Sequence, residues 1–458
     1  MEYSIFIGRY EFLEPVIIIQ DLDLVKMITI KDFEYFHDHR GFIDDKIEPL
    51  AARNLFLLKG QDWKDMRLTL SPAFTSSKIK LMVPFMEEVG DQMIRALKKK
   101  ISTSECKYTG YIDVDCKDLT ARYGTDVIAS CAFGLKVDSH ADENNKFFQM
   151  GKTASAFKVW HMLMFFILSA CPSVAKRLKL TIFSKEVTNF FIDLVLNTMK
   201  DREERNIIRP DMIHLLMEAK KGKLSHDDKS GKADQGAGFA TVTEYSVGKK
   251  STKKAWSDID LVAQAVIFFM AGYESISTAT SFALHELALH PDVQERLFQE
   301  IKEEDRRKRG KIDFTSIQNM TYMDMVTSEV LRIWPPAMAL DRICANDYNI
   351  GKPNENAAQD YIVKKDEVVY IPVRCFHFDP QYFPNPEKFD PERFSEENKH
   401  NINPMAYMPF GLKVLLYQIL LHIEVSPSKK TKLPSTLSKE SFNPKLEGGH
   451  WLRFKMRC

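Results

Sequence analysis

The stretch from Ser257 to His290, SDIDLVAQAVIFFMAGYESISTATSFALHELALH, constrains the fold more than any other part of the chain. Its first half is apolar nearly all round a helical wheel, which predicts a long helix buried on every side. Ser257 and Asp260 predict the N-terminal cap of this helix, and Pro291 ends it. We therefore expect the rest of the chain to pack around it.

The centre of this predicted helix is unusual for a plain core helix. Gly272 lies mid-helix, where glycine costs about 1 kcal/mol relative to alanine, and Glu274 and Ser275 follow it. A glycine lets another group approach the backbone closely, and a serine can bond to the carbonyl four residues earlier and loosen the helix. On this stretch alone a kinked core helix is the simpler interpretation, and a helix that contacts a ligand is the alternative.

Composition bounds the class of protein. A chain of 458 residues can form one large domain or two to three ordinary ones, and 44% hydrophobic residues with 31 Phe predict a large core. Lys and Arg total 64 against 63 Asp and Glu, so the net charge of +1 does not favour a nucleic-acid partner. Seven cysteines without a CxxC pair argue against a disulfide framework or a zinc site, which predicts a reducing compartment.

The sequence predicts neither a signal peptide nor a membrane span. The opening residues MEYSIFIGRYEF lack a basic region followed by an apolar one. The longest uninterrupted apolar runs, AVIFFMAG and WHMLMFFILSAC (residues 160–171), are shorter than the roughly 18 residues that a spanning helix needs. The second run fits either a helix lying on a membrane surface or an ordinary buried helix.

The remaining pattern predicts a mainly α fold with a small β region. Pro15 to Gln20 is predicted as a strand, Asp21 to Ile30 as a helix, and Met82 to Lys220 as several amphipathic helices. The segment DEVVYIPVRCF, residues 366–376, alternates as strands do. Residues 218–254 are rich in Lys, Gly, Asp and Ser and predict a flexible surface loop inside a single domain covering residues 1–458.

Two residue pairs have spacings that bring their side chains together. Trp63 and Arg67 are four apart on a short predicted helix, and an indole N–H beside a guanidinium suits a carboxylate or phosphate. Glu329 and Arg332 face each other in an apolar context, and a buried pair of this kind needs further partners. Arg393, in the proline-rich and aromatic segment FHFDPQYFPNPEKFDPERF, is placed to reach them. The same spacing in Glu303/Arg306 and Glu304/Arg307 predicts solvated surface pairs.

Taken together, these motifs resemble those of a cytochrome P-450. The matching segments are Trp63-x-x-x-Arg67, Ala271-Gly272-Tyr273-Glu274-Ser275, Glu329-Val-Leu-Arg332 and Pro391-Glu392-Arg393-Phe394, in the family's order and approximate spacing. The resemblance covers nearly all the chain and is closest to the insect microsomal, detoxification-type branch. It implies a haem-dependent monooxygenase that oxidises lipophilic small molecules with O2. Its electrons would come from an NADPH-dependent reductase, at the cytosolic face of the endoplasmic reticulum membrane.

The resemblance also assigns roles to residues of this chain. Haem would be held between the central helix and a later cysteine loop, with Glu274 and Ser275 handling protons. Ser275 departs from the family's usual threonine but keeps a hydroxyl. Glu329, Arg332 and Arg393 would form a structural triad. The residues implied to contact haem, at its propionates or its ring, are Arg40, Trp63, Arg67, Ala271, Gly272, Arg342 and Phe410.

The chain departs from the family in two places. The membrane-spanning N-terminal helix of the microsomal branch is not found ahead of the first strand, so this chain could be cytosolic. The haem-ligand loop FGxGxRxCxG is expected after Phe410-Gly411, but Leu412-Lys413-Val414 follows instead. Roughly 15–20 residues, including the axial thiolate cysteine, are therefore predicted to be deleted after Gly411. Among possible substitutes are Cys344, Cys375, Cys458 and His422, and no metal ligand is assigned. The alternative function is a catalytically inactive splice or gene-model variant without thiolate-ligated haem.

Overall fold

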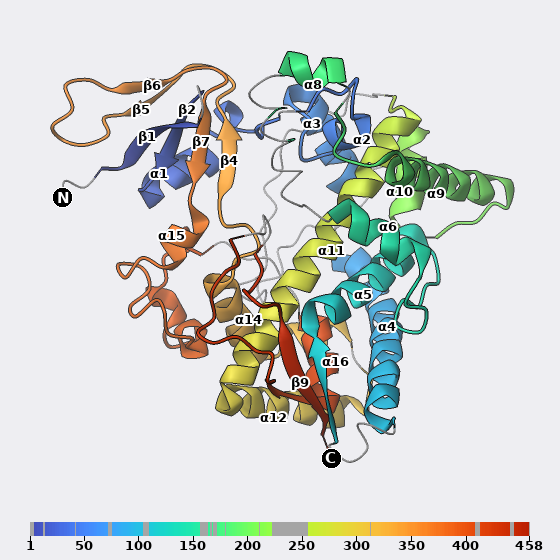
Figure 1. The fold of residues 1–458 in the computed structure, drawn as a ribbon. Helices are drawn as coiled ribbons and strands as arrows, with labels where there is room; N and C mark the ends of the chain where they lie inside the picture. Colours follow the sequence, from blue (N-terminus) through green and yellow to red (C-terminus); the bar gives the residue numbers. More distant parts are fainter. Residues whose placement is uncertain are drawn as a thin grey trace.

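The computed structural model describes most of the chain (Figure 1). The described residues are 4–11, 14–41, 43–71, 76–103, 110–155, 164, 167, 172–178, 180–209, 211–221, 255–311, 313–407, 413–439 and 444–457. The predicted loop therefore falls outside the description from residue 222 to 254. Its first residues, Glu218 to Lys220, belong to a helix instead, because the apolar face of that helix continues to Ala219.

Helices make up most of the described residues. Their bounds are α1 (Leu22–Lys26), α2 (Pro49–Ala52), α3 (Gly60–Leu70), α4 (Ser76–Ser102), α5 (Cys116–Ile128), α6 (Lys146–Ser155), α8 (Pro172–Leu178), α9 (Lys185–Glu204), α10 (Met212–Lys220), α11 (Asp258–Leu289), α12 (Pro291–Lys308), α13 (Phe314–Gln318), α14 (Thr321–Ile333), α15 (Val373–His377) and α16 (Lys413–His422). Shorter π or 3-10 turns are η1 (Met27–Lys31), η2 (Phe33–Tyr35), η4 (Ala129–Phe133), η5 (Pro391–Phe394) and η6 (Lys399–Asn401).

The strands form small sheets at the edges of the helical body. They are β1 (Phe6–Glu11), β2 (Glu14–Ile19), β3 (Tyr111–Asp115), β4 (Leu340–Ile343), β5 (Tyr348–Gly351), β6 (Tyr361–Val363), β7 (Val368–Ile371), β8 (Ile423–Pro427) and β9 (Trp451–Met456). One sheet has the order β1-β2-β7-β4, with only β2 and β7 parallel, and a second has the order β3-β9-β8. The mainly α prediction with a small β region is confirmed.

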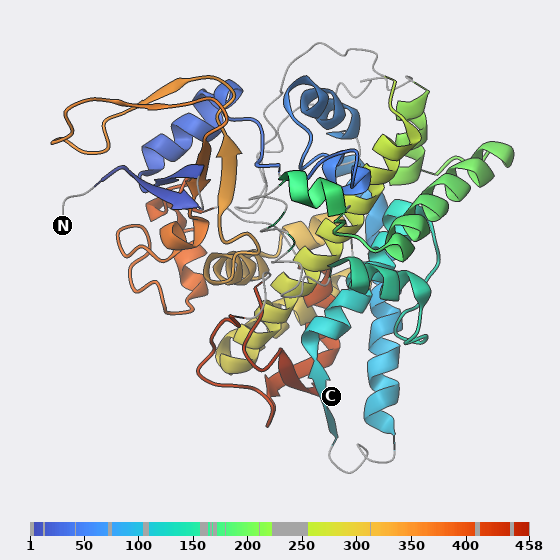
Figure 2. The same ribbon diagram turned by 45° about the horizontal axis from the view of Figure 1, so that its top comes forward.

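The central helix α11 forms as predicted and runs diagonally through the molecule (Figures 1 and 2). Ser257 and Asp260 form a reciprocal capping box at its start, and α12 begins at Pro291. Its two halves belong to two separate hydrophobic clusters. The first half, through Tyr273, lies in one cluster with residues of α6, α9 and α10, and the second half, from Ala279, lies in the other with residues of α4, α5, α14 and α16. This single helix therefore joins the two cores.

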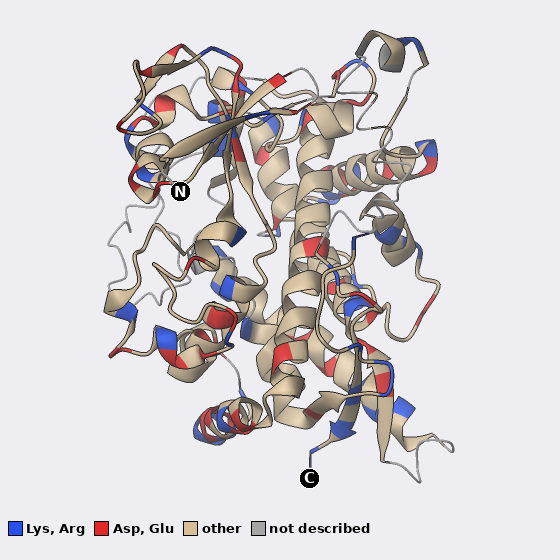
Figure 3. Cartoon of the chain, turned by 60° about the vertical axis from the view of Figure 1, so that its left-hand side comes forward, with Lys and Arg blue, Asp and Glu red and all other residues tan. Residues whose placement is uncertain are grey.

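The helix α11 is also long and apolar enough to cross a membrane, which the sequence analysis did not foresee because it counted only uninterrupted apolar runs. Length and composition alone give that result, and the core helix of a soluble protein meets the same criterion. Figure 3 shows this helix mostly tan with a few acidic residues, while charged residues of both signs gather on outer elements such as α12. Its packing between two hydrophobic clusters explains its apolar composition.

The local predictions agree with the structure except at their ends. The strand predicted at Pro15 to Gln20 is β2, and the helix predicted at Asp21 to Ile30 is α1 followed by the π-helical turn η1. The segment DEVVYIPVRCF forms a strand only up to Ile371, and Val373 to His377 form α15. Pro372 lies at this change because proline cannot donate the hydrogen bond that would continue the strand.

Candidate functional site

The most exposed residue of α11 lies in the middle of the helix. Ala271 is exposed and Glu274, Ser275 and Ile276 are half-buried, whereas every residue from Ser277 to Ala288 is buried. These residues lie between the two hydrophobic clusters that bury the ends of the helix. An opening at this point is the kind of place where a bound group can lie against the helix, between two packed cores.

Gly272 lies close to the side chain of a neighbouring helix. A Cβ at this position would lie 2.6 Å from Ile128 Cδ1, on the neighbouring helix α5. On α5, Gly124 faces Ile276 and the Gly272 carbonyl at ordinary van der Waals distances. The close approach that the sequence predicted at Gly272 is therefore made by another helix. The implied contact of Gly272 with haem stays a prediction that concerns its backbone.

Glu274 and Ser275 are both engaged in hydrogen bonds. Lys117 Nζ lies 2.6 Å from Glu274 Oε1, and the Thr278 hydroxyl donates to the same oxygen at 3.0 Å. Ser275 Oγ donates to the Ala271 carbonyl at 2.6 Å, which is the back-bonding predicted from the sequence. Lys117 was missed by the sequence analysis, because 157 residues separate it from Glu274 and no local pattern pairs them.

Other residues implied to contact haem lie on α3 and β4, and both elements are hydrogen-bonded to Asp38. Asp38 Oδ1 accepts from the Gly60 N–H at the start of α3, and its carbonyl accepts from Ile343 N–H in β4, both at 2.8 Å. Trp63 packs against the rings of Phe33 and His37. The structure therefore brings the helix of Trp63 and Arg67 and the strand of Arg342 to one side of the molecule.

Arg342 is a half-buried cation with few partners. Its Nη1 donates to the Asp341 carbonyl at 2.7 Å, while its buried Nε has no hydrogen-bond partner among the described residues. Burial lowers the pKa of this guanidinium, partly opposed by Asp341. Leaving buried donors unpaired is costly, so a planar fork of this kind fits an anionic ligand such as a propionate.

Arg40 differs from its expected role. Its Nη1 lies 2.7 Å from Glu11 Oε2, its Nη2 lies 2.5 Å from Glu14 Oε2, and its backbone N–H donates to Asp341. Two carboxylates of the β1–β2 hairpin thus occupy this guanidinium. The structure places Arg40 as an anchor for the hairpin, and a contact with haem would require these ion pairs to break.

The triad residues come together in a buried network. Arg332 makes two hydrogen bonds to the Glu329 carboxylate, at 2.7 and 2.8 Å, and both side chains have 0% exposed area. Arg393 Nε lies 3.4 Å from Glu329 Oε1, and Asp390 N–H donates to the same oxygen at 2.9 Å. Arg332 also donates to the His377 carbonyl. Burial raises the pKa of Glu329, and Arg332 opposes that shift.

The expected axial-ligand region is only partly described. Phe410 and Gly411 lie outside the described residues, and α16 begins at Lys413. Cys344 is buried and donates to the Asn346 carbonyl at 2.8 Å, and burial raises the pKa of its thiol to about 11. Burial likewise raises the pKa of the Cys116 and Cys131 thiols. Burial therefore favours the protonated thiol at all three positions when no metal is bound.

The remaining candidates for the axial haem ligand are two cysteines and a histidine. Cys375 is exposed on α15, Cys458 lies outside the described residues, and His422 ends α16. Among the described residues no group of three or more His, Cys, Asp or Glu could hold a metal ion. The unpartnered Nε of Arg342 and the exposed Ala271 are compatible with a bound haem, and no axial ligand is assigned among the described residues.

Known proteins resemble this chain over nearly all its length. A profile of the family described as cytochrome P-450 matches residues 3–443. Cytochrome P-450 9e2 of Blattella germanica is 42% identical, with 98% of this chain and 85% of the relative covered. Probable cytochrome P-450 9f2 of Drosophila melanogaster is 38% identical, over 99% of this chain and 86% of the relative. Cytochrome P-450 6k1 of Blattella germanica is 35% identical, with coverages of 95% and 82%.

The mainly helical fold, the buried network of Glu329, Arg332 and Arg393, and these relatives all indicate the same family. The chain belongs to the cytochrome P-450 family, and its relatives place it in the insect branch. The family is one of haem-dependent monooxygenases, so an oxidoreductase activity and a haem iron cofactor are what family membership supports.

Replacing Arg342 with methionine tests its predicted role through two opposite effects. We expect the haem-free protein to keep its stability or gain up to about 1 kcal/mol, because a half-buried and incompletely paired charge is removed. We expect haem affinity to fall about 10-fold, because one charge-assisted contact is lost. Urea unfolding and haem titration measure the two quantities. A loss of stability without any change in haem affinity would show that Arg342 is only structural.

Proposed function

We propose that this chain binds haem against the exposed middle of α11, and oxidises lipophilic small molecules with O2 and electrons from an NADPH-dependent reductase. The observation that carries the proposal is the exposure of Ala271, with half-buried Glu274 and Ser275 beside it, in the middle of a mostly buried helix. The helix presents a small residue, a carboxylate and a hydroxyl together. The surrounding clusters are apolar and aromatic, which suits a lipophilic substrate.

Each residue has a role in this proposal that follows from its chemistry. Bound haem would supply the O2 and one-electron chemistry. Arg342, with Trp63 and Arg67 from α3, would hold the propionate carboxylates through charge-assisted hydrogen bonds. The Glu274 carboxylate would accept and release a proton at its oxygens, and the Ser275 hydroxyl would relay a proton at Oγ when it leaves the Ala271 carbonyl.

We also propose that the protein works at the cytosolic face of the endoplasmic reticulum membrane. Its support is an apolar surface on α8, where Val174 and Leu178 are exposed. Large exposed aliphatic side chains on a short helix suit contact with a lipid surface. The run at residues 160–171, which was predicted to be either a membrane-surface helix or a buried helix, lies mostly outside the described residues, and within it Met164 is buried.

A second candidate is a catalytically inactive splice or gene-model variant that lacks thiolate-ligated haem. It rests on the sequence after Gly411, which continues directly into α16. Lys413, in the first turn of this helix, forms an ion pair with Asp324 of α14. The buried face of α16 packs against α4 and α12, so this helix can dock without a preceding ligand loop.

The absorbance spectrum of the purified chain with haemin, after reduction and addition of carbon monoxide, separates the two candidates. The monooxygenase proposal expects a Soret band at the red-shifted position typical of thiolate ligation, and Cys344→Ser, Cys375→Ser and Cys458→Ser would then identify the cysteine. A band at the histidine-type position, or no haem uptake, would support the inactive variant. The Arg342→Met variant is the control for specific uptake.

A further inference from the structure

The ion pair between Lys117 and Glu274 joins α5 to the middle of α11. Lys117 Nζ lies 2.6 Å from Glu274 Oε1 and also contacts the Thr278 hydroxyl, which itself donates to Oε1. Glu274 Oε2 has no hydrogen bond from the described part of the chain. One carboxylate oxygen is therefore held by two donors from two helices, and the other is left available.

The backbone of Lys117 is fixed by its neighbours in the second sheet. Asp115, the last residue of β3, caps α5 by accepting from Lys117 N–H at 3.0 Å, and Asp115 is paired with Trp451 of β9. The N–H of Cys116, which lies between Asp115 and Lys117, donates to the His450 carbonyl at 2.9 Å. The ammonium group therefore extends from a rigid junction between a helix and a sheet, which limits where it can reach.

The charged groups around Lys117 leave Glu274 as its ion-pair partner among the described residues. Burial lowers the pKa of the Lys117 ammonium, and the negative charges of Glu274 and Asp115 oppose that shift. The positive charge of Lys445 lowers the same pKa. His450 also faces this ammonium, and burial lowers the pKa of that imidazole to about 3, with a smaller contribution from Lys117. A neutral imidazole does not compete for the Glu274 carboxylate.

The pair lies at the border between the core and solvent. The Lys117 and Glu274 side chains keep 21% and 25% of their area exposed, while Thr120, Ser277 and Ser281 beside them are buried. An ion pair held by a third group and partly removed from water is more specific in its geometry than a surface pair. It can thus fix one rotamer of the carboxylate.

We propose that Lys117 is a positioning residue that holds the Glu274 carboxylate toward α5, with Oε1 anchored and Oε2 available. This inference rests on the proposed function for its catalytic meaning, because Glu274 is the proposed proton carrier. Its geometric content concerns only the two helices, and can be tested in the chain without haem.

Carbodiimide labelling of the full chain, followed by mass spectrometry of the peptide that contains Glu274, tests the position directly. In Lys117→Met we expect labelling of Glu274 to be about 5-fold faster than in the wild type, because the anchored oxygen is released. Lys117→Arg keeps the charge and should restore slow labelling. Equal labelling rates in the wild type and Lys117→Met, or no rescue by arginine, would overturn the proposal.

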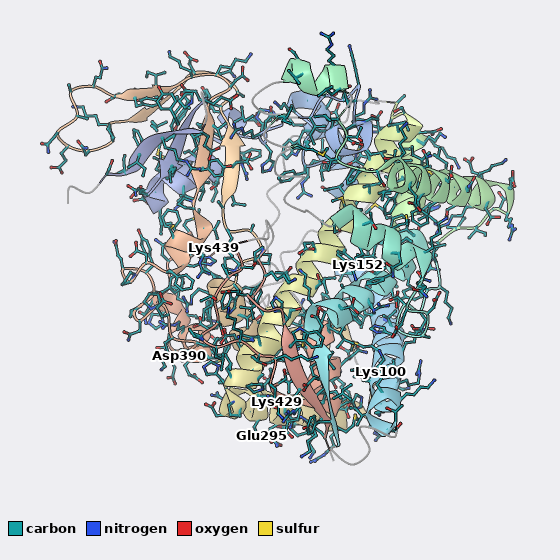
Figure 4. The ribbon with its side chains drawn as sticks, in the orientation of Figure 1. Lys100, Lys152, Glu295, Asp390, Lys429 and Lys439 are labelled. Carbon is teal, nitrogen blue, oxygen red and sulfur yellow. The ribbon has the colours of Figure 1, made fainter. Side chains whose placement is uncertain are left out.

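A matched control is the exposed pair of Lys100 and Glu143. Lys100 is labelled at the end of α4 in Figure 4. Its Nζ lies 3.3 Å from Glu143 Oε1, and both side chains are mostly exposed. Lys100→Met should leave labelling of both Glu143 and Glu274 unchanged. A faster reaction at Glu274 in this variant would indicate general loosening and count against the proposal.

Haem-loaded protein supplies the second measurement. Lys117→Met should lower kcat about 5-fold with KM unchanged, and Lys117→Arg should recover it. If the wild-type chain takes up no haem, the proposed function fails, while the labelling result still decides the position of Glu274. If haem binds and labelling is unchanged by Lys117→Met, the positioning inference fails alone.

Discussion

Replacing Arg332 with methionine should lower the unfolding free energy by about 3–5 kcal/mol, because the Glu329 carboxylate would be left buried without its main partner. Both side chains are fully buried, and Arg332 also holds the carbonyls of His377 and Lys388 at 2.9 and 3.3 Å. The substitution therefore removes the contacts that join α14 to the segment leading to η5. Near Asp390, labelled in Figure 4, that segment contacts Glu329 directly. Urea unfolding of the haem-free chain measures the loss.

The pair of Glu304 and Arg307 is a matched control for this variant. It has the same spacing and two hydrogen bonds, at 2.7 and 2.5 Å, but the Arg307 side chain is 61% exposed. Arg307→Met should leave the urea midpoint within experimental scatter, because water replaces the lost partner. If both variants shift the midpoint equally, burial is not what makes the Glu329 pair important.

Gly151→Ala should destabilise the protein by about 1–3 kcal/mol, although alanine is the better helix former. A Cβ on Gly151, in α6, would overlap the ring of Phe269 in α11. That ring is fully buried and packs against Phe147 and Phe191, with ring centroids 5.1 and 5.2 Å away, so it has no room to move. Thermal or urea unfolding measures the effect.

Gly124→Ala is expected to have the opposite sign. Gly124 is also helical, in α5, but a Cβ there would meet Ile276 at 3.7 Å, an ordinary contact. The substitution should stabilise the protein by up to about 1 kcal/mol through helix propensity. If both alanine variants change stability in the same direction, the packing difference between the two glycines is not the cause.

Much of the fold could be predicted because its signals are local. The cap at Ser257, the apolar surface of α11 and the stop at Pro291 all act within a few residues of the backbone they control. The ExxR pair was separated from its surface look-alikes by apolar neighbours. The structure buries Glu329 and Arg332 and pairs Glu304 with an exposed Arg307, whereas no ion pair joins Glu303 and Arg306 among the described interactions. Family resemblance predicted the roles of the site residues, and those roles remain predictions.

The parts that could not be predicted depend on contacts between distant segments. Nothing near Arg40 in sequence shows that Glu11 and Glu14 would occupy its guanidinium, since the β1–β2 hairpin brings them together only after folding. The same holds for Lys117 and Glu274. Gly272 was marked as a close-approach position, but only the packing of α5 identifies what approaches it.

The sequence by itself determined the mainly helical class, the central helix and the family, because periodicity, caps and ordered motifs are properties of the chain. Only the tertiary structure decided which charges are paired, which are left over at Arg342, and where α11 opens between its two cores. The physical reason is that the energy of a buried charge depends on the groups around it in space, and those groups come from segments far apart in the chain.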